Sequence, residues 1–101
     1  MVNFEITGVI SQIGPLREGV NSESGKPWAR RTVVINQTDA DRELASVSFD
    51  LRGDRALEVK WKDLPLVEGM HVSAQLGCHT HQSAKTGAWW NELYCFALQR
   101  C

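Results

Sequence analysis

The clearest pattern in the chain is an alternation of apolar and polar residues between Ala45 and Arg52. A period of two puts all the apolar side chains on one face of a strand, so this segment predicts a half-buried antiparallel strand. The same period recurs from His71 to Cys78 and predicts a second strand of this kind. We expect the inward residues of one core to include Val47, Phe49, Leu51, Val72, Ala74, Leu76 and Leu93.

The remaining strands are marked by β-branched and aromatic residues, which favour strands. We expect them at 2–13, 28–36 and 88–100. Gly, Pro, Asn and Ser mark the connections, which are a long loop at 14–27, a turn at 37–42 and a loop at 79–87. After Gly53, residues 54–62 predict a short helix with Leu57 and Trp61 on one face, which we expect to pack against the barrel.

The order of elements is therefore strand, long loop, strand, strand, short helix, strand, loop and strand. This order predicts an all-β fold, a closed five-stranded Greek-key barrel of the OB-fold type, with the short helix between strands three and four. A small barrel of the SH3 type accommodates the helix less well. Because 101 residues suffice for one core and no repeat or linker is present, we expect a single domain over residues 1–101.

Composition excludes some classes of protein. The chain is 43% hydrophobic and 23% charged, as soluble proteins are, and no apolar run approaches the length that crosses a bilayer. The N-terminal segment predicts a strand and not a secretory signal. The three cysteines are an odd number and do not form the spaced framework of a disulfide-rich protein, which favours free thiols in a reducing compartment. We expect a cytoplasmic protein.

The formal net charge is −1, which removes the simplest signal of a nucleic-acid-binding domain. The charges are nevertheless unevenly distributed. Residues 24–37 contain Lys26, Arg30 and Arg31 and no acid, whereas three acids lie between 38 and 43. Since binding depends on the local distribution of charge, the basic segment is a candidate for one side of a binding groove.

Tryptophans stand beside these cations. Trp28 begins the second expected strand, and Trp89 and Trp90 follow the turn that contains Lys85. A strand directs adjacent residues to opposite faces, so Trp89 and Trp90 cannot both point inward. Aromatic side chains that stack bases and cations that contact phosphates are what single-strand binding requires. The alternative is that these aromatics cap the core or fill a subunit interface.

Four blocks of the sequence carry a family resemblance, namely GVISQIGPLREGVNSESGKPWARRTVVI, VSFDLRGDRA, LPLVEGMHVSAQL and GAWWNELYCFAL. In this order and spacing, the chain resembles a small bacterial OB-fold family of uncharacterised proteins, allied to single-stranded DNA-binding proteins and primosomal protein B. The resemblance implies single-strand binding in DNA replication or repair. Single-stranded DNA-binding proteins carry outward aromatics on the third strand, where this chain has Ser46 and Arg52, so we expect stacking there to be reduced or replaced.

An OB-fold binds its ligand on strands two and three and on the loops that flank them. Arg31 shares the inward parity of Val33, which makes Arg30 the better phosphate contact. The expected function is non-enzymatic binding of single-stranded DNA, or of RNA, with little sequence preference; a module that holds a protein partner is the alternative. The candidate binding residues are Lys26, Trp28, Arg30, Arg31, Arg52, His79, His81, Lys85, Trp89 and Trp90.

Other chemistry has weaker support in the sequence. Cys78, His79 and His81 are residue types that bind zinc, but a zinc site needs three or four converging ligands and Cys78 has inward parity. No Gly-rich phosphate loop or nucleophile elbow is present. We therefore expect no metal, no cofactor and no enzymatic activity. The aromatic residues of the last strand, among them Tyr94 and Phe96 on the parity of Trp90, predict a two-fold homodimer.

Overall fold

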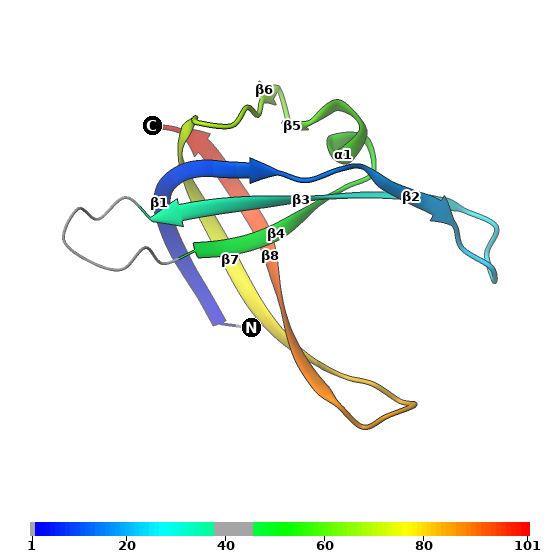
Figure 1. The fold of residues 1–101 in the computed structure, drawn as a ribbon. Helices are drawn as coiled ribbons and strands as arrows, with labels where there is room; N and C mark the ends of the chain where they lie inside the picture. Colours follow the sequence, from blue (N-terminus) through cyan, green and yellow to red (C-terminus); the bar gives the residue numbers. More distant parts are fainter. Residues whose placement is uncertain (1, 38–45) are drawn as a thin grey trace.

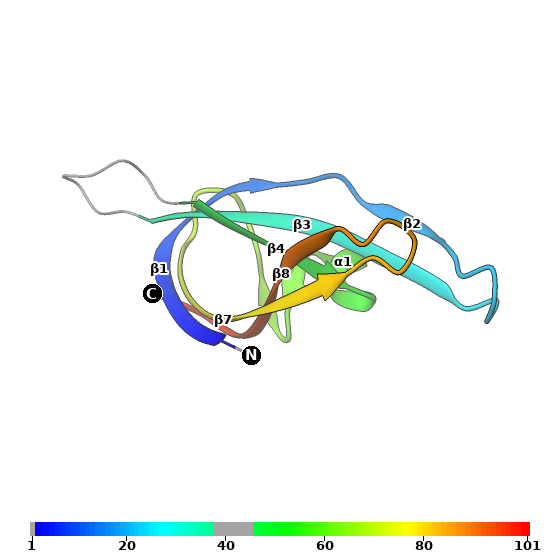
Figure 2. The same cartoon turned by 90° about the horizontal axis from the view of Figure 1, so that it is seen from below.

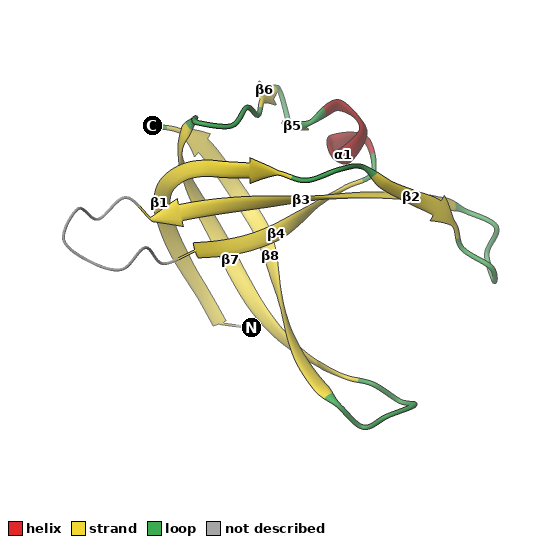
Figure 3. Cartoon of the chain, viewed as in Figure 1, coloured by secondary structure: helices red, strands yellow, loops and turns green. Residues whose placement is uncertain are grey.

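The computed structural model describes residues 2–37 and 46–101, and most of this backbone is β-strand (Figures 1 and 3). The long strands are β1 (Val2–Ile13), β3 (Pro27–Gln37), β4 (Ser46–Arg52), β7 (His71–Gln82) and β8 (Trp89–Arg100). The short elements are β2 (Arg17–Val20), α1 (Asp54–Glu58), β5 (Lys60–Trp61) and β6 (Leu64–Pro65). The all-β class is confirmed. Residues 38–42 of the turn predicted at 37–42, and the first residue of the predicted strand, Ala45, lie outside the described residues.

The long strands form one antiparallel sheet that curves around the core (Figure 2). β3 pairs with β1 and β2 along one edge and with β4 along the other, while β1 continues to β7 and β7 to β8. The predicted closed barrel is wrong for the part of the chain that the structure describes, because no ladder joins β4 to β8. Side chains bridge these two edges instead, with Arg52 Nη2 lying 2.6 Å from Glu92 Oε1.

The core contains the residues that the alternation predicts. Five of the seven predicted core residues are buried, and Val47 and Leu93 are half-buried against them. Ser46 and Ser48, on the opposite face of β4, are exposed. The core also includes Ile6, Ile10, Val33, Ile35 and Leu98 from the other long strands. A slip of one residue would exchange the two faces of a strand, so this burial confirms the predicted parity of β4 and β7.

Two hairpins extend beyond the core to the same side of the molecule as arms (Figures 1 and 2). The β2–β3 arm comprises residues 17–30, and the β7–β8 arm comprises residues 79–92. The loops predicted at 14–27 and 79–87 are therefore wrong in part, because Arg17–Val20 pairs with the start of β3 and β7 continues to Gln82. Within the described residues, no helix is long and apolar enough to cross a membrane.

The same turn geometry closes both arms. In the β2–β3 arm, the backbone N–H of Asn21 donates to Lys26 O at 2.8 Å, and Gly25 donates to Asn21 O at 2.8 Å. In the β7–β8 arm, Ser83 bonds to Ala88 and Gly87 bonds back to Ser83 in the same way, each at 2.9 Å. Both glycines have positive φ, 68° and 72°, which only glycine adopts without a steric cost.

The predicted helix is shorter than expected. It ends at Glu58 because Val59 takes the left-handed conformation, with φ 53°, and donates its backbone N–H to the carbonyl of Arg55. Ala56 is the buried residue of the helix, whereas Leu57 is 50% exposed. Trp61 is buried at 5% exposure, as predicted, but it lies on β5 and shares no helix face with Leu57.

Candidate nucleic-acid interface

Three arginines form a row across the outer face of the sheet. Strand register places Arg17 of β2 directly opposite Arg30 of β3, and Arg30 directly opposite Arg52 of β4. We call these residues the arginine row. Arg17 Nη2 contacts Asp50 Oδ1 at 3.3 Å, and Arg52 contacts Glu92. Among the described residues, Arg30 has neither an ion pair nor a side-chain hydrogen bond.

Trp28 lies beside the row on the β2–β3 arm. Its cross-strand neighbour is Gly19, and a Cβ at Gly19 would lie only 2.8 Å from Trp28 Cζ2. The absence of a side chain at Gly19 therefore lets the indole ring pack against β2 while it stays 44% exposed. Arg17, Lys26, Trp28 and Arg30 line one hollow of about 570 Å³ together with Asn21, Ser24 and Pro27. This hollow combines an aromatic surface with three cations.

A second aromatic group lies on the β7–β8 arm. The His81 and Trp90 rings are stacked with centroids 5.3 Å apart, and the His79 ring meets His81 edge-on at 4.6 Å. His81 Nε2 lies 2.9 Å from the Tyr94 hydroxyl. These four residues, which we call the aromatic cluster, share a face because the register pairs His81 with Trp90. Trp90 is 48% exposed, so part of the indole surface remains open to a ligand.

Glu92 connects the aromatic cluster to the arginine row. Its Oε2 accepts a hydrogen bond from the Tyr94 hydroxyl at 2.9 Å and lies 3.2 Å from His81 Nε2, while its Oε1 contacts Arg52. The hydrogen bond to Glu92 is the main cause that raises the pKa of Tyr94, with removal from water and the negative charge adding to it. The Arg52 guanidinium carbon lies 5.4 Å from the Tyr94 ring centroid. The row and the cluster are therefore continuous.

Seven of the ten candidate residues belong to this surface, namely Lys26, Trp28, Arg30, Arg52, His79, His81 and Trp90. Lys26 and Lys85 are exposed at the ends of the two arms. Trp89 is 67% exposed and belongs to the opposite face of β8, so neither tryptophan of the adjacent pair points inward. This arrangement is possible because the β7–β8 arm extends beyond the core and has no buried face at this point.

Arg31 has the inward parity that the sequence predicts. Its Nε donates to Ala56 O at 2.9 Å and its Nη1 donates to Gly14 O at 3.1 Å, so the guanidinium connects β3 to the helix and to the end of β1. These hydrogen bonds use the side chain within the fold. We therefore infer that Arg31 stabilises the fold, and we do not include it in the interface.

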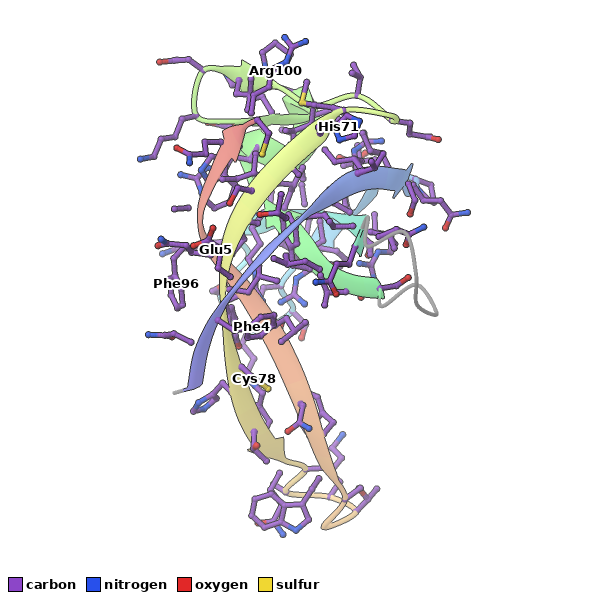
Figure 4. All side chains as sticks on the ribbon, turned by 90° about the vertical axis from the view of Figure 1, so that its left-hand side faces the viewer. Phe4, Glu5, His71, Cys78, Phe96 and Arg100 are labelled. Carbon is purple, nitrogen blue, oxygen red and sulfur yellow. The ribbon has the colours of Figure 1, made fainter. Side chains whose placement is uncertain are left out.

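Sequence reasoning missed Arg17 and Tyr94. Arg17 falls in the segment predicted as a loop, and only the pairing of β2 with β3 aligns it with Arg30. Tyr94 has the parity predicted for it, but Phe96 does not extend the same stripe, because the β7–β8 register shifts between Cys95 and Ala97. Phe96 instead lines a hollow with Phe4 and Glu5, in the part of the sheet formed by β1, β7 and β8 (Figure 4).

The cysteine and histidine residues near the interface do not form a cluster suited to a metal. Within residues 2–37 and 46–101, no three His, Cys, Asp or Glu side chains converge as metal ligands would. Cys78 lies on the opposite face of β7 from His79 and His81. The three cysteines are free, and burial raises the pKa of the half-buried Cys95 to about 12.

Comparison with known proteins does not identify relatives. No protein-family model matches the sequence, and a search of curated proteins finds no significant match. The functional argument therefore depends on the geometry of the interface.

Proposed function

We propose that this chain is a non-enzymatic module that binds single-stranded DNA with little sequence preference. The arginine row is the observation that supports this function most strongly. Like charges directly opposite each other on neighbouring strands destabilise a sheet. Two such pairs share Arg30, whose charge has no partner among the described residues. A bound phosphate would offset this repulsion, because guanidinium groups bind phosphate oxygens through two parallel hydrogen bonds.

Exposed tryptophans on the two arms supply the second part of the function. Trp28 and Trp90 lie at opposite ends of the continuous surface that runs through Arg30, Arg52 and Tyr94. Bases of an unpaired strand could stack on both indole rings while the phosphates between them lie over the arginine row. Bases within a duplex are already stacked on each other, so this arrangement favours single strands. Contacts to base edges are not required, and sequence preference would be weak.

An OB-type architecture is part of the proposal. The strand order β4-β3-β1-β7-β8 and the helix that follows β4 are those of a five-stranded Greek-key sheet with a partly open seam. In such an architecture the two arms would correspond to the loops that flank the ligand of an OB-fold. The family resemblance of the sequence would follow from the same architecture.

A binding titration tests the function. Fluorescence anisotropy of a labelled oligothymidylate of about 16 nucleotides, the upper end of the site sizes for one such domain, would give the dissociation constant at 50 and 200 mM salt. Arg30→Gln should weaken binding and reduce the salt slope by about 0.7, the value for one phosphate contact in a single strand. Arg100→Gln is the matched control, because Arg100 lies beside His71 at the end of the sheet away from the β7–β8 arm (Figure 4).

The result that would exclude the function is equally specific. Wild-type protein that does not bind the oligothymidylate at 50 mM salt, or binds it no better than duplex DNA, would leave the protein-interaction module as the remaining candidate. The same titration with oligouridylate would compare RNA with DNA. The predicted homodimer stays a prediction, and sedimentation at tens of micromolar protein would test it.

A further inference from the structure

A third hollow lies in the seam between β4 and β8, next to the arginine row. Its volume is about 190 Å³. The lining residues are Asp50, Leu51, Arg52, Arg55, Trp61, Tyr94 and Cys95. Because Arg52 and Tyr94 also belong to the interface described above, the hollow continues that surface toward the helix.

Arg55 is the residue of this hollow that the interface does not yet use. Its guanidinium carbon lies 4.1 Å from the centroid of the Trp61 ring, which is buried and therefore fixed in position. This contact holds the guanidinium by its face and leaves its N–H groups available at the edge. Within the described residues, no carboxylate forms an ion pair with Arg55 and no acceptor receives a hydrogen bond from it.

The other charged groups of the hollow already have partners. Asp50 accepts a hydrogen bond from Thr32 at 2.8 Å and contacts Arg17, while Arg52 contacts Glu92. Arg55 is half-buried, so its charge is partly removed from water, and no acid of the described part of the chain compensates it. A guanidinium that is held in place, partly desolvated and without an acid partner is prepared to bind an anion.

We propose that this hollow is a phosphate subsite, in which Arg55 and Arg52 together hold a phosphodiester of the bound single strand. The inference rests on the proposed function and extends it, because it directs the strand from the arginine row into the seam beside Tyr94. The seam is open to such a contact since the edges of β4 and β8 are joined by side chains and not by a backbone ladder. Arg55 is thus a further binding residue for the same ligand.

The alternative is that Arg55 only stabilises the turn between α1 and β5 by packing on Trp61. Two substitutions separate these roles. Arg55→Gln removes the charge but keeps a planar polar group, and Arg55→Lys keeps the charge but loses the planar stack. If the role is only packing, both changes should lower the melting temperature and neither should alter the salt dependence of binding.

The test uses the labelled oligothymidylate at 50 and 200 mM salt. Loss of one phosphate contact reduces the salt slope by about 0.7, so the affinity ratio of wild type to Arg55→Gln should shrink about 2.6-fold over this fourfold range. Arg55→Lys should restore the wild-type slope, and Arg100→Gln should leave it unchanged. A competition experiment adds inorganic phosphate at matched ionic strength. If the subsite also accepts free phosphate, phosphate should displace the strand more strongly from wild type than from Arg55→Gln. Equal displacement would mean that the subsite binds only the phosphodiester of the strand.

A measurement on the wild-type protein covers the case in which a variant does not fold. The NMR resonances of the Arg55 Nε–H and the Trp61 indole N–H should shift when the oligothymidylate is added, and the Arg100 Nε–H should not. The subsite proposal would be wrong if Arg55→Gln kept the affinity and salt slope of wild type while Arg30→Gln bound more weakly. The proposed function would then still stand. Failure of the wild-type protein to bind any strand would overturn both.

Discussion

Gly19 offers a way to displace Trp28 without removing it. A Cβ at this position would lie 2.8, 3.0 and 3.1 Å from three atoms of the Trp28 indole, whereas nonbonded carbon atoms prefer about 3.5–4.0 Å. In Gly19→Ala the ring must therefore retreat by about 0.5–1 Å or rotate away from β2. The backbone tolerates the change, because Gly19 is not among the glycines with positive φ.

Stability and binding should respond differently to this substitution. Replacing Gly by Ala in a compatible conformation stabilises a protein by about 0.4–1 kcal/mol, which offsets some of the lost indole packing. We therefore expect the free energy of unfolding to change by less than about 1 kcal/mol. Complete removal of a stacking tryptophan costs about 1–3 kcal/mol of binding, so a displaced ring should cost about 1 kcal/mol, equivalent to a roughly fivefold higher dissociation constant.

The assay combines urea denaturation with anisotropy of a labelled oligothymidylate. Gly14→Ala is the matched control, because a Cβ at Gly14 would meet its nearest atom, Thr32 O, at an ordinary 3.4 Å and would not touch Trp28. The control should bind as wild type does. Wild-type affinity in Gly19→Ala, with a shifted Trp28 indole resonance that proves the displacement, would refute the stacking role of Trp28.

Three further predictions address the remaining parts of the site and fold. Trp90→Ala should weaken strand binding by about 1–3 kcal/mol and Trp89→Ala by clearly less, because only Trp90 shares the face of the aromatic cluster; equal losses in a titration would contradict this orientation. Burial raises the pKa of Cys95 from 9.0 to about 12, so Cys95 should resist thiol reagents at pH 8 while the exposed Cys101 reacts; equal labelling rates would contradict this. For the same reason, the contribution of Cys95 to the free energy of unfolding should be complete below pH 9 and fall as the pH rises toward 12. Arg31→Met should lower the free energy of unfolding by about 1–3 kcal/mol in urea, because two backbone carbonyls lose their donor, and reduced strand affinity at unchanged stability would argue for a binding role instead.

The sequence predicts the parts of the fold that depend on local alternation. Val33, Phe49 and Leu76 are buried as their parity requires, and Arg30 and Arg52 lie on the outer face for the same reason. Burial of one face decides which alternate residues of a strand point inward, and this pattern can be read from the sequence of each strand by itself. The pairing of Arg30 with Arg52 also follows once the two strands are known to be neighbours.

The extent of the arms could not be predicted in the same way. Residues 17–20 and 79–82 have no buried face, so they lack the hydrophobic period that marks a strand. The turns that close the arms require glycine at their fifth position, and the related segments NSESGK and SAKTGA both satisfy this requirement. Similar turn sequences at two sites are the signal that could have predicted the hairpins, and with them the alignment of Arg17.

Long-range contacts account for the remaining errors. The shift in register at Cys95 moves Phe96 off the stripe of Trp90, although their spacing alone predicts a shared face. The open seam between β4 and β8 also depends on side chains far apart in the sequence, such as Arg52 and Glu92. No local pattern encodes either feature, because both arise from how the last strand meets the rest of the sheet.

The acids on the interface reconcile a net charge of −1 with a function that needs cations. Asp50 and Glu92 each contact one outer member of the arginine row, which reduces the repulsion that three aligned guanidinium groups would otherwise cause during folding. A phosphate must compete with these carboxylates for Arg17 and Arg52, but among residues 2–37 and 46–101 no carboxylate competes with it for Arg30. The unpaired central arginine should therefore contribute most of the affinity that the row supplies, while the two paired arginines mainly position the strand.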